Sequence, residues 1–269
     1  MAGWRSGSRG SLMLGWFRRW RRRRLLTRYA IDDTLWRDTV AGDPLLSALE
    51  WRECERLREL STLFLAEKEF YGAAGHELDA AQCTRIAAVA CLLVLELGLE
   101  WYRGWYTIIV YPVGFRARHR VADDSGVVHA LESDLSGEAW ETGPVVLSWE
   151  DVNAARRLDG YNVVLHEFAH KLDMLDGASN GIPPLHRGME PGEWTEAFTA
   201  AWNAAEAAFD AGHPPLIDNY ALEAPEEFFA VSTEAFFEIP LQLKSRLPRV
   251  YEQLKRFYRQ DPVVRARRA

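Results

Sequence analysis

Cysteine and long hydrophobic runs are both scarce in this sequence. Its 269 residues include only Cys54, Cys83 and Cys91, and the last two flank an apolar stretch. That arrangement suits buried, reduced thiols better than a disulfide framework. The longest apolar run, Ile86 to Leu95, is about half as long as a bilayer span, and no cleavable secretory signal is visible. We therefore expect a cytoplasmic protein.

Acidic residues are missing from the first 28 positions, which contain nine Arg. The rest of the chain holds 23 basic and 39 acidic side chains, a net charge of -16. A body of that charge repels nucleic-acid phosphates, so no direct nucleic-acid binding is expected. The tail, residues 1–28, interleaves Trp16, Phe17 and Trp20 with Arg, and these residue types settle at lipid headgroups. We expect a solvated arm, with peripheral membrane contact as the alternative.

The hydrophobic pattern predicts an α+β protein without internal repeats. A helical part, residues 29–104, precedes a second part, residues 105–269, that begins with a small mid-chain sheet. Helices are predicted over Glu50–Phe70, Asp79–Leu97, Trp194–Phe209 and Pro225–Phe237. Strands are predicted over Trp105–Tyr111, Gly126–Leu131 and Pro144–Trp149. The charged segment Val113–Ser125 is expected to be a mobile loop.

One short motif carries metal-binding chemistry. His166, Glu167 and His170 form the pattern His-Glu-x-x-His, and on a helix the two histidines share one face. Two imidazoles one turn apart hold one zinc ion, and the adjacent Glu supplies a general base for the attacking water. The composition predicts only about 0.02 chance matches to this pattern. We therefore expect one Zn²⁺ per chain, used to hydrolyse peptide bonds.

A catalytic zinc ion of this class needs a third protein ligand, usually His or Glu. The metzincin pattern would have Gly and His where Asp173 and Asp176 stand, which excludes that class. Four downstream carboxylates qualify by type: Glu223, Glu226, Glu227 and Glu234. Glu227 and Glu234 share one helix face, so the pattern leaves both open. Asp173 could orient a ligand imidazole, or be a plain helix-end carboxylate.

Four stretches resemble the Mlc titration factor A (MtfA) family of zinc peptidases. They are Leu93–Trp101, Gly143–Trp149, His166–Asp173, and Glu227–Ser232 with Glu234–Phe237. The similarity extends over residues from about 30 to 265 and implies a zincin-like fold similar to the catalytic domain of anthrax lethal factor. It implies a glutamate-type zincin in which His166, His170 and Glu227 bind zinc and Glu167 is the base. Glu234 then becomes a supporting carboxylate.

The same resemblance gives roles to Tyr220 and His129. Tyr220 matches an active-site tyrosine of the family, whose hydroxyl can stabilise the oxyanion of the reaction. The alternative is an ordinary loop tyrosine. His129 matches a histidine that can also bind the zinc, and a fourth protein ligand would close the site and make the enzyme latent. The alternative is a strand-end histidine without a metal role.

The resemblance implies aminopeptidase-like action on a peptide substrate. It also implies a partner, a transcription repressor of the Mlc type that the protein would bind and sequester. The rival hypothesis is a non-catalytic regulatory protein that titrates such a repressor and has a structural or vestigial zinc site. The intact Glu167 argues against a vestigial site. A third hypothesis, a protease recruited to the membrane surface by the tail, has the same chemistry at a different place.

Overall fold

The computed structural model describes residues 20–113, 115–122, 128–135, 137–139, 143–212, 216–217 and 219–268, with backbone alone for the strands between 115 and 139. Residues 20–28 are helical. The helices that follow before the sheet are α2 (Asp33–Ala41), α3 (Pro44–Ser47), α4 (Trp51–Glu67), α5 (Ala80–Leu93) and the 3₁₀ turn η1 (Leu99–Tyr102). Those after the sheet are α6 (Trp149–Ala154), α7 (Val163–Asp173), η2 (Met174–Asp176), α8 (Pro191–Asp210), η3 (Asn219–Leu222), α9 (Pro225–Glu238), α10 (Pro240–Arg246), α11 (Pro248–Tyr258) and α12 (Pro262–Ala266).

Local sequence signals start many of these helices. The Asp79 side chain accepts a hydrogen bond from the Gln82 amide while Gln82 bonds back, which forms a capping box at α5. Proline opens the helices α3, α8, α9, α10, α11 and α12. A proline costs nothing there, because the amide of the first turn has no partner within the helix.

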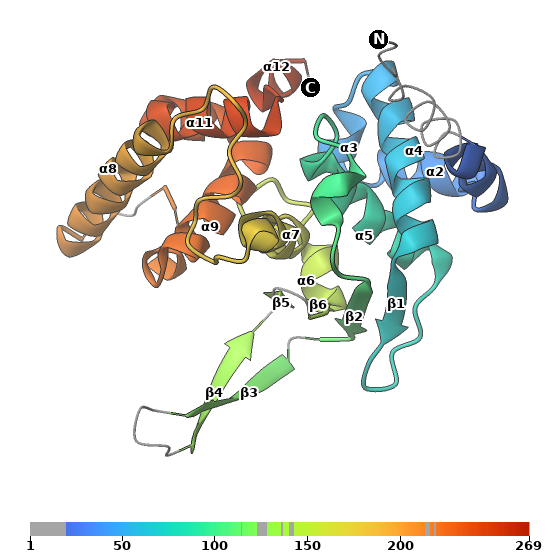
Figure 1. The fold of residues 1–269 in the computed structure, drawn as a ribbon, viewed down its shortest axis with the longest axis horizontal. Coiled ribbons are helices and arrows are strands. Elements are labelled where there is room, and N and C mark those ends of the chain that lie inside the picture. The colour runs from blue at the N-terminus through green and yellow to red at the C-terminus, as the bar shows by residue number, and fades with distance from the viewer. Residues whose placement is uncertain are drawn as a thin grey trace, which may run out of the picture.

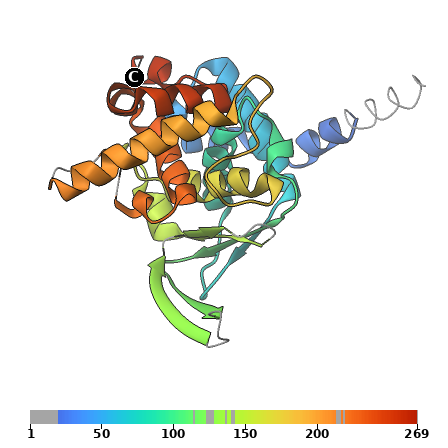
Figure 2. The same ribbon diagram turned by 60° about the vertical axis from the view of Figure 1, so that its left-hand side comes forward.

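A four-stranded sheet has the order β1 (Glu69–Gly72), β2 (Thr107–Tyr111), β6 (Val145–Ser148) and β5 (Gly137–Ala139). The first three strands are parallel, and β5 is antiparallel at the edge. The crossover from β1 to β2 contains α5, as parallel pairing requires. Ile108 and Val110 of β2 are fully buried, as is Val145 of β6, so helices cover this sheet on the core side. Strands β3 (Phe115–Ala122) and β4 (Val128–Leu135) form a separate antiparallel ribbon that extends away from the helices (Figures 1 and 2).

Helix α7 lies at the centre, with the early helices α2 to α5 on one side and α8, α9 and α11 on the other (Figure 1). Phe168 of α7 contacts Phe64, Tyr102 and Trp105, whose ring centroids lie 5.2 to 5.8 Å from its own. One hydrophobic core includes residues from both sides of α7. The motif helix is therefore held by packing on two sides.

Two expectations from the sequence are wrong here. The helix expected over Glu50–Phe70 ends at Glu67, because Lys68 adopts extended backbone and β1 begins at the next residue. The loop expected over Val113–Ser125 contains the eight-residue strand β3. Its backbone pairs with β4 along its whole length, from Phe115 opposite Leu135 to Ala122 opposite Val128.

The three predicted strands are confirmed as β2, β4 and β6, although Trp149 already begins α6 and residues 126–127 lie outside the described chain. The expected helices correspond to α4, α5, α8 and α9, although α5 ends at Leu93 and not at Leu97. None of the described helices combines the length and the apolar character that crossing a bilayer would demand.

Candidate metal centre

Helix α7 places three polar side chains inside the core. The Asn162 side chain accepts a hydrogen bond from the Leu165 amide at 3.2 Å and so starts the helix. His166, Glu167 and His170 are less than a tenth exposed. Burying such groups costs free energy unless they have partners, and the partners of the two histidines come from α9.

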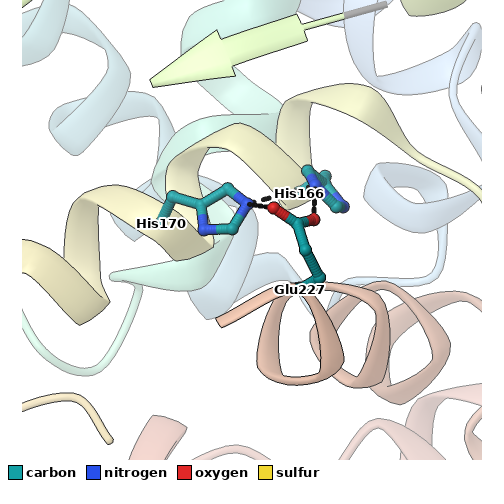
Figure 3. A group of neighbouring side chains, drawn as sticks. All are labelled: His166, His170 and Glu227. Atoms are coloured by element: carbon teal, nitrogen blue, oxygen red, sulfur yellow. Dashed lines mark hydrogen bonds and ion pairs between the residues drawn. The ribbon is translucent and has the colours of Figure 1, made fainter. Parts of the chain in front are cut away.

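Glu227, in the first turn of α9, faces both histidines of the motif (Figure 3). Its two carboxylate oxygens lie 3.1 Å from His166 Nε2 and 3.4 Å from His170 Nε2. The two Nε2 atoms are 3.2 Å apart. One donor atom from each of the three residues lies within 4.8 Å of the others. The three donors thus converge on a single point between α7 and α9.

The glycine at 181 fixes where α9 begins. Gly181 has a φ of +75°, and a Cβ there would lie 2.4 Å from the carbonyl oxygen of Pro225, the first residue of α9. Its own carbonyl accepts a hydrogen bond from Trp194 Nε1 at 3.0 Å. This close backbone approach holds the first turn of α9, and therefore Glu227, against the loop that follows α7.

Glu234 approaches His166 from the other side of the ring. Its Oε1 lies 2.8 Å from His166 Nδ1, and its Oε2 accepts a hydrogen bond from the Asn162 amide. A carboxylate at Nδ1 fixes the orientation of the ring and leaves Nε2 to face Glu227. The structure therefore brings Glu227, and not Glu234, to the point where the two Nε2 atoms meet.

Sequence reasoning missed a second carboxylate behind this one. Glu238 accepts a hydrogen bond from Asn162 Nδ2 at 2.9 Å and, more weakly, from the Gly160 amide. Burial raises the pKa of Glu238 to about 8. Asn162 therefore links Glu238 to Glu234 and caps α7 at the same time. The only local signal in the sequence was the four-residue spacing of Glu234 and Glu238 on α9. That spacing does not identify Asn162 as their common partner.

The site is electrostatically asymmetric. Burial lowers the pKa of His166, but the charge of Glu234 and hydrogen bonds with both carboxylates outweigh it, so this pKa lies well above its usual value. Burial also lowers the pKa of His170, and there it outweighs the opposing effect of Glu227, so this pKa lies below its usual value. Burial also raises the pKa of Glu227, but hydrogen bonds with the two histidines outweigh it and leave this pKa well below its usual range. An ionised Glu227 and a neutral His170 are the forms that bind metals, and His166 would release one proton on binding.

The remaining candidates lie at different places. Tyr220, in η3, has its ring centroid 5.9 Å from that of His166, and burial together with the charge of Glu227 raises its pKa. His129 lies in β4, opposite Val121 in the ribbon, and its side chain lies outside the described part of the structure. Asp173 Oδ2 accepts hydrogen bonds from the amides of residues 180 and 181. Among the described contacts, Asp173 therefore holds a loop rather than an imidazole.

The donor set suits a zinc ion. Two imidazole nitrogens and one carboxylate oxygen are the three protein ligands of a common class of catalytic zinc site, and they leave a further position open. Hard cations such as Mg²⁺ prefer sets made of oxygen alone. The charge of Glu167 also acts on His166 and on Tyr220, so a carboxylate lies near the point of convergence.

Comparison with known proteins agrees with this chemistry. A match to the family described as glucose-regulated metallo-peptidase M90 covers residues 17–259. Mlc titration factor A of Salmonella arizonae is 39% identical over 240 residues, which are 87% of this chain and 94% of that protein. The protein of the same name from Salmonella schwarzengrund is 38% identical over 241 residues, 88% of this chain and 89% of its own. The chain therefore belongs to the M90 family of glucose-regulated metallo-peptidases, together with the Mlc titration factors A.

Proposed function

We propose that this protein is a zinc-dependent peptidase whose zinc ion is held by His166, His170 and Glu227. The observation that carries the proposal is the convergence of their donor atoms within 4.8 Å in a buried setting. Bound there, zinc would act as a Lewis acid that acidifies a water molecule and polarises the peptide carbonyl. In this proposal the protein is a glutamate-type zincin. Its third ligand, Glu227, lies two helical turns before Glu234, which orients His166.

Glu167 is the proposed general base. It lies between the two histidines on a rigid, fully buried helix, so its carboxylate needs no large rearrangement to take a proton from water. The proton then passes to the leaving amine. Tyr220 is the proposed oxyanion donor, because burial and nearby carboxylates raise its pKa and keep its hydroxyl protonated.

We further propose aminopeptidase-like action on peptides in the cytoplasm. His129 is proposed as a fourth, displaceable zinc ligand, which would make the resting enzyme latent.

The similarity to proteins named Mlc titration factor A supports a second role, the binding of a repressor of the Mlc type. The helical part, residues 29–104, would then support the catalytic part, residues 105–269. The basic tail is the proposed point of peripheral membrane contact.

The decisive experiment combines metal analysis with hydrolysis of a panel of chromogenic aminoacyl substrates by the full-length protein. Wild type should contain one zinc per chain and hydrolyse at least one substrate. Glu167→Gln should retain zinc and lose kcat by at least ~100-fold, the scale expected for loss of a general base. The exposed Glu206 on α8 offers a matched control, and Glu206→Gln should behave as wild type.

Near-normal turnover by Glu167→Gln would contradict the assignment of the base. Zinc-loaded wild type that hydrolyses nothing in the panel would favour the non-catalytic alternative, a protein that only titrates a repressor. Co-purification with an Mlc-type repressor tests the second role separately. Glu167→Gln should retain that binding, because the substitution preserves the shape of the site.

A further inference from the structure

A cleft of about 610 Å³ lies on the side of the early helices, away from the three metal-site donors. Its walls are helix 20–28, α4, and the segment 97–106 that contains η1. Figure 2 shows residues 20–28 extending from the body beside α4. This volume lies in the range of small-molecule binding sites, about 300 to 1,000 Å³. None of the residues proposed to bind zinc or substrate lines the cleft.

The cleft is basic in a chain whose body is acidic. Its cationic lining residues are Arg21, Arg22, Arg56, Lys68 and Arg103, and its acidic ones are Glu67 and Glu100. A cleft lined mainly by one sign of charge concentrates the opposite ion, because the low dielectric of its walls focuses the field. The ligand that this cleft favours is therefore an anion.

Three of these arginines are available to an external ligand. Arg22 is paired with Glu59 of α4 at 2.8 Å. Side chains of Arg21, Arg56 and Arg103 make no ion pair or hydrogen bond with any residue in the described part of the chain. They come from three separate wall elements. Guanidinium groups bind phosphate with two parallel hydrogen bonds, and several around one cleft suit a single multiply charged group.

Apolar side chains also line the cleft. Leu25, Leu97 and Leu99 are half-buried in its walls, and the exposed Tyr106 lies beside them. Lys68 is nine-tenths buried and donates hydrogen bonds of 2.6 Å to the carbonyls of residues 102 and 105. Its Nζ lies 3.7 Å from the ring centroid of Trp105. These contacts hold Lys68 against Trp105 at the floor of the cleft.

We propose that this cleft binds a phosphate monoester with an apolar or aromatic body. The phosphate group would lie among the guanidinium groups of Arg21, Arg56 and Arg103, and the body would pack on the half-buried leucines and on Tyr106. Two sources have this chemistry, a soluble nucleotide-like phosphate and a lipid phosphate. The cleft shares no lining residue with the three donors of the metal centre.

Isothermal titration of the zinc-loaded, full-length protein tests the proposal with three probes: inorganic phosphate, adenosine monophosphate and dihexanoyl phosphatidic acid below its micelle concentration. We expect at least one of the two organic phosphates to bind at least tenfold more tightly than inorganic phosphate. The one that binds identifies the source. Affinity should fall as salt rises, because the attraction of exposed arginines is screened.

Matched charge variants then locate the binding. The double variant Arg56→Gln/Arg103→Gln removes two exposed cleft arginines and should weaken binding at least tenfold. Arg157→Gln/Arg187→Gln makes the same change in net charge at exposed positions away from the cleft and should bind as wild type. Failure of both organic phosphates to bind, an equal loss in both double variants, or equal affinity for inorganic phosphate would overturn the proposal. Binding that survives Glu227→Ala separates this site from the metal centre.

Discussion

His166 is held between two carboxylates of a single helix, and the two face different nitrogens. Glu234 lies 2.8 Å from Nδ1, whereas Glu227 lies 3.1 Å from Nε2. The spacing of seven residues is about two helical turns, so both side chains point toward α7. Glu227 stands in the first turn of α9, where the helix dipole favours an ionised carboxylate. The geometry therefore divides the pair into a candidate ligand and an orienting group.

Removing each carboxylate should have a different effect on metal content. Glu227→Ala should abolish stoichiometric zinc binding, because it deletes one of three donors. Glu234→Ala should weaken zinc binding by about 10- to 100-fold, the range for loss of a group that orients a ligand. Metal analysis after dialysis against a graded zinc chelator measures both. If Glu234→Ala is the variant that loses zinc completely, the assignment of the third ligand is wrong.

The sequence identifies the motif residues of this site but not the choice between the two carboxylates. His166, Glu167 and His170 are recognisable because their spacing is local and rare. Glu227 and Glu234 share a helix face, and which of them meets Nε2 depends on how α9 is placed against α7. That placement is a tertiary property without a local signal. The resemblance to a known family separated the two where the pattern alone could not.

At the scale of elements, the position of α9 depends on a glycine in the loop after α7. Gly181→Ala would force a Cβ to 2.4 Å from the carbonyl oxygen of Pro225, and the φ of +75° would add backbone strain. The start of α9 must then shift and take Glu227 with it. We expect a lower melting temperature and weaker zinc binding.

The matched control is Gly188→Ala. Gly188 has a φ of +90°, but no atom lies within 4 Å of the position of an added Cβ. It should therefore lose stability through strain alone and keep the zinc affinity of wild type. Equal zinc affinity in the two variants, measured by competition with a chelator, would show that the contact with Pro225 does not position Glu227.

The ribbon of β3 and β4 contains the proposed fourth ligand. A fourth protein donor would take the position that water needs, so its removal should activate the enzyme. His129→Ala should keep zinc bound and raise basal peptidase activity, while any stimulation by a partner shrinks. His119→Ala, on the neighbouring strand opposite Leu131, is the control and should leave activity unchanged. A His129→Ala variant with unchanged activity and zinc affinity would exclude the latency hypothesis.

Strands β1 and β3 were not predicted from the sequence, for a physical reason. The segment Phe115–Ala122 alternates Arg with smaller or apolar residues, which is a strand pattern, yet its charge suggests a loop. Its pairing with β4 along its whole length is a backbone contact that the local pattern does not reveal. Likewise, β1 has only four residues and follows α4 directly, so the helical pattern hides it. Strand stability depends on neighbours more than on local propensity.

For the whole molecule, one core joins the helical part to the part that carries the candidate metal site. Buried residues of α5 and of α7, such as Leu92 and Leu165, belong to the same core cluster. Strands β2 and β6 of the sheet also contribute buried residues to it, and Phe70 of β1 packs against it. Stability and the geometry of the site are therefore coupled, since α7 has no face turned to solvent.

The molecule also separates its charges, with cations concentrated in the tail and acids in the body. Residues 1–28 contain no candidate ligand, base or oxyanion donor. The described contact of helix 20–28 through Arg22 and Glu59 is an exposed ion pair, a type worth little to stability. Truncations of residues 2–19 and 2–28 should therefore retain zinc and peptidase activity.

The same two truncations should change binding to anionic liposomes in steps. They remove four and nine Arg respectively. Each Arg near an anionic surface contributes about 1 kcal/mol, an attraction that falls within a Debye length and weakens with salt. Co-sedimentation with phosphatidylglycerol vesicles should therefore decrease with the first truncation and disappear with the second. Vesicles of phosphatidylcholine alone should bind neither the full-length protein nor the truncations. If the variant that lacks residues 2–28 sediments as well as the full-length protein, the interaction comes from the acidic body or is not electrostatic. The tail would then lose its proposed role at the membrane.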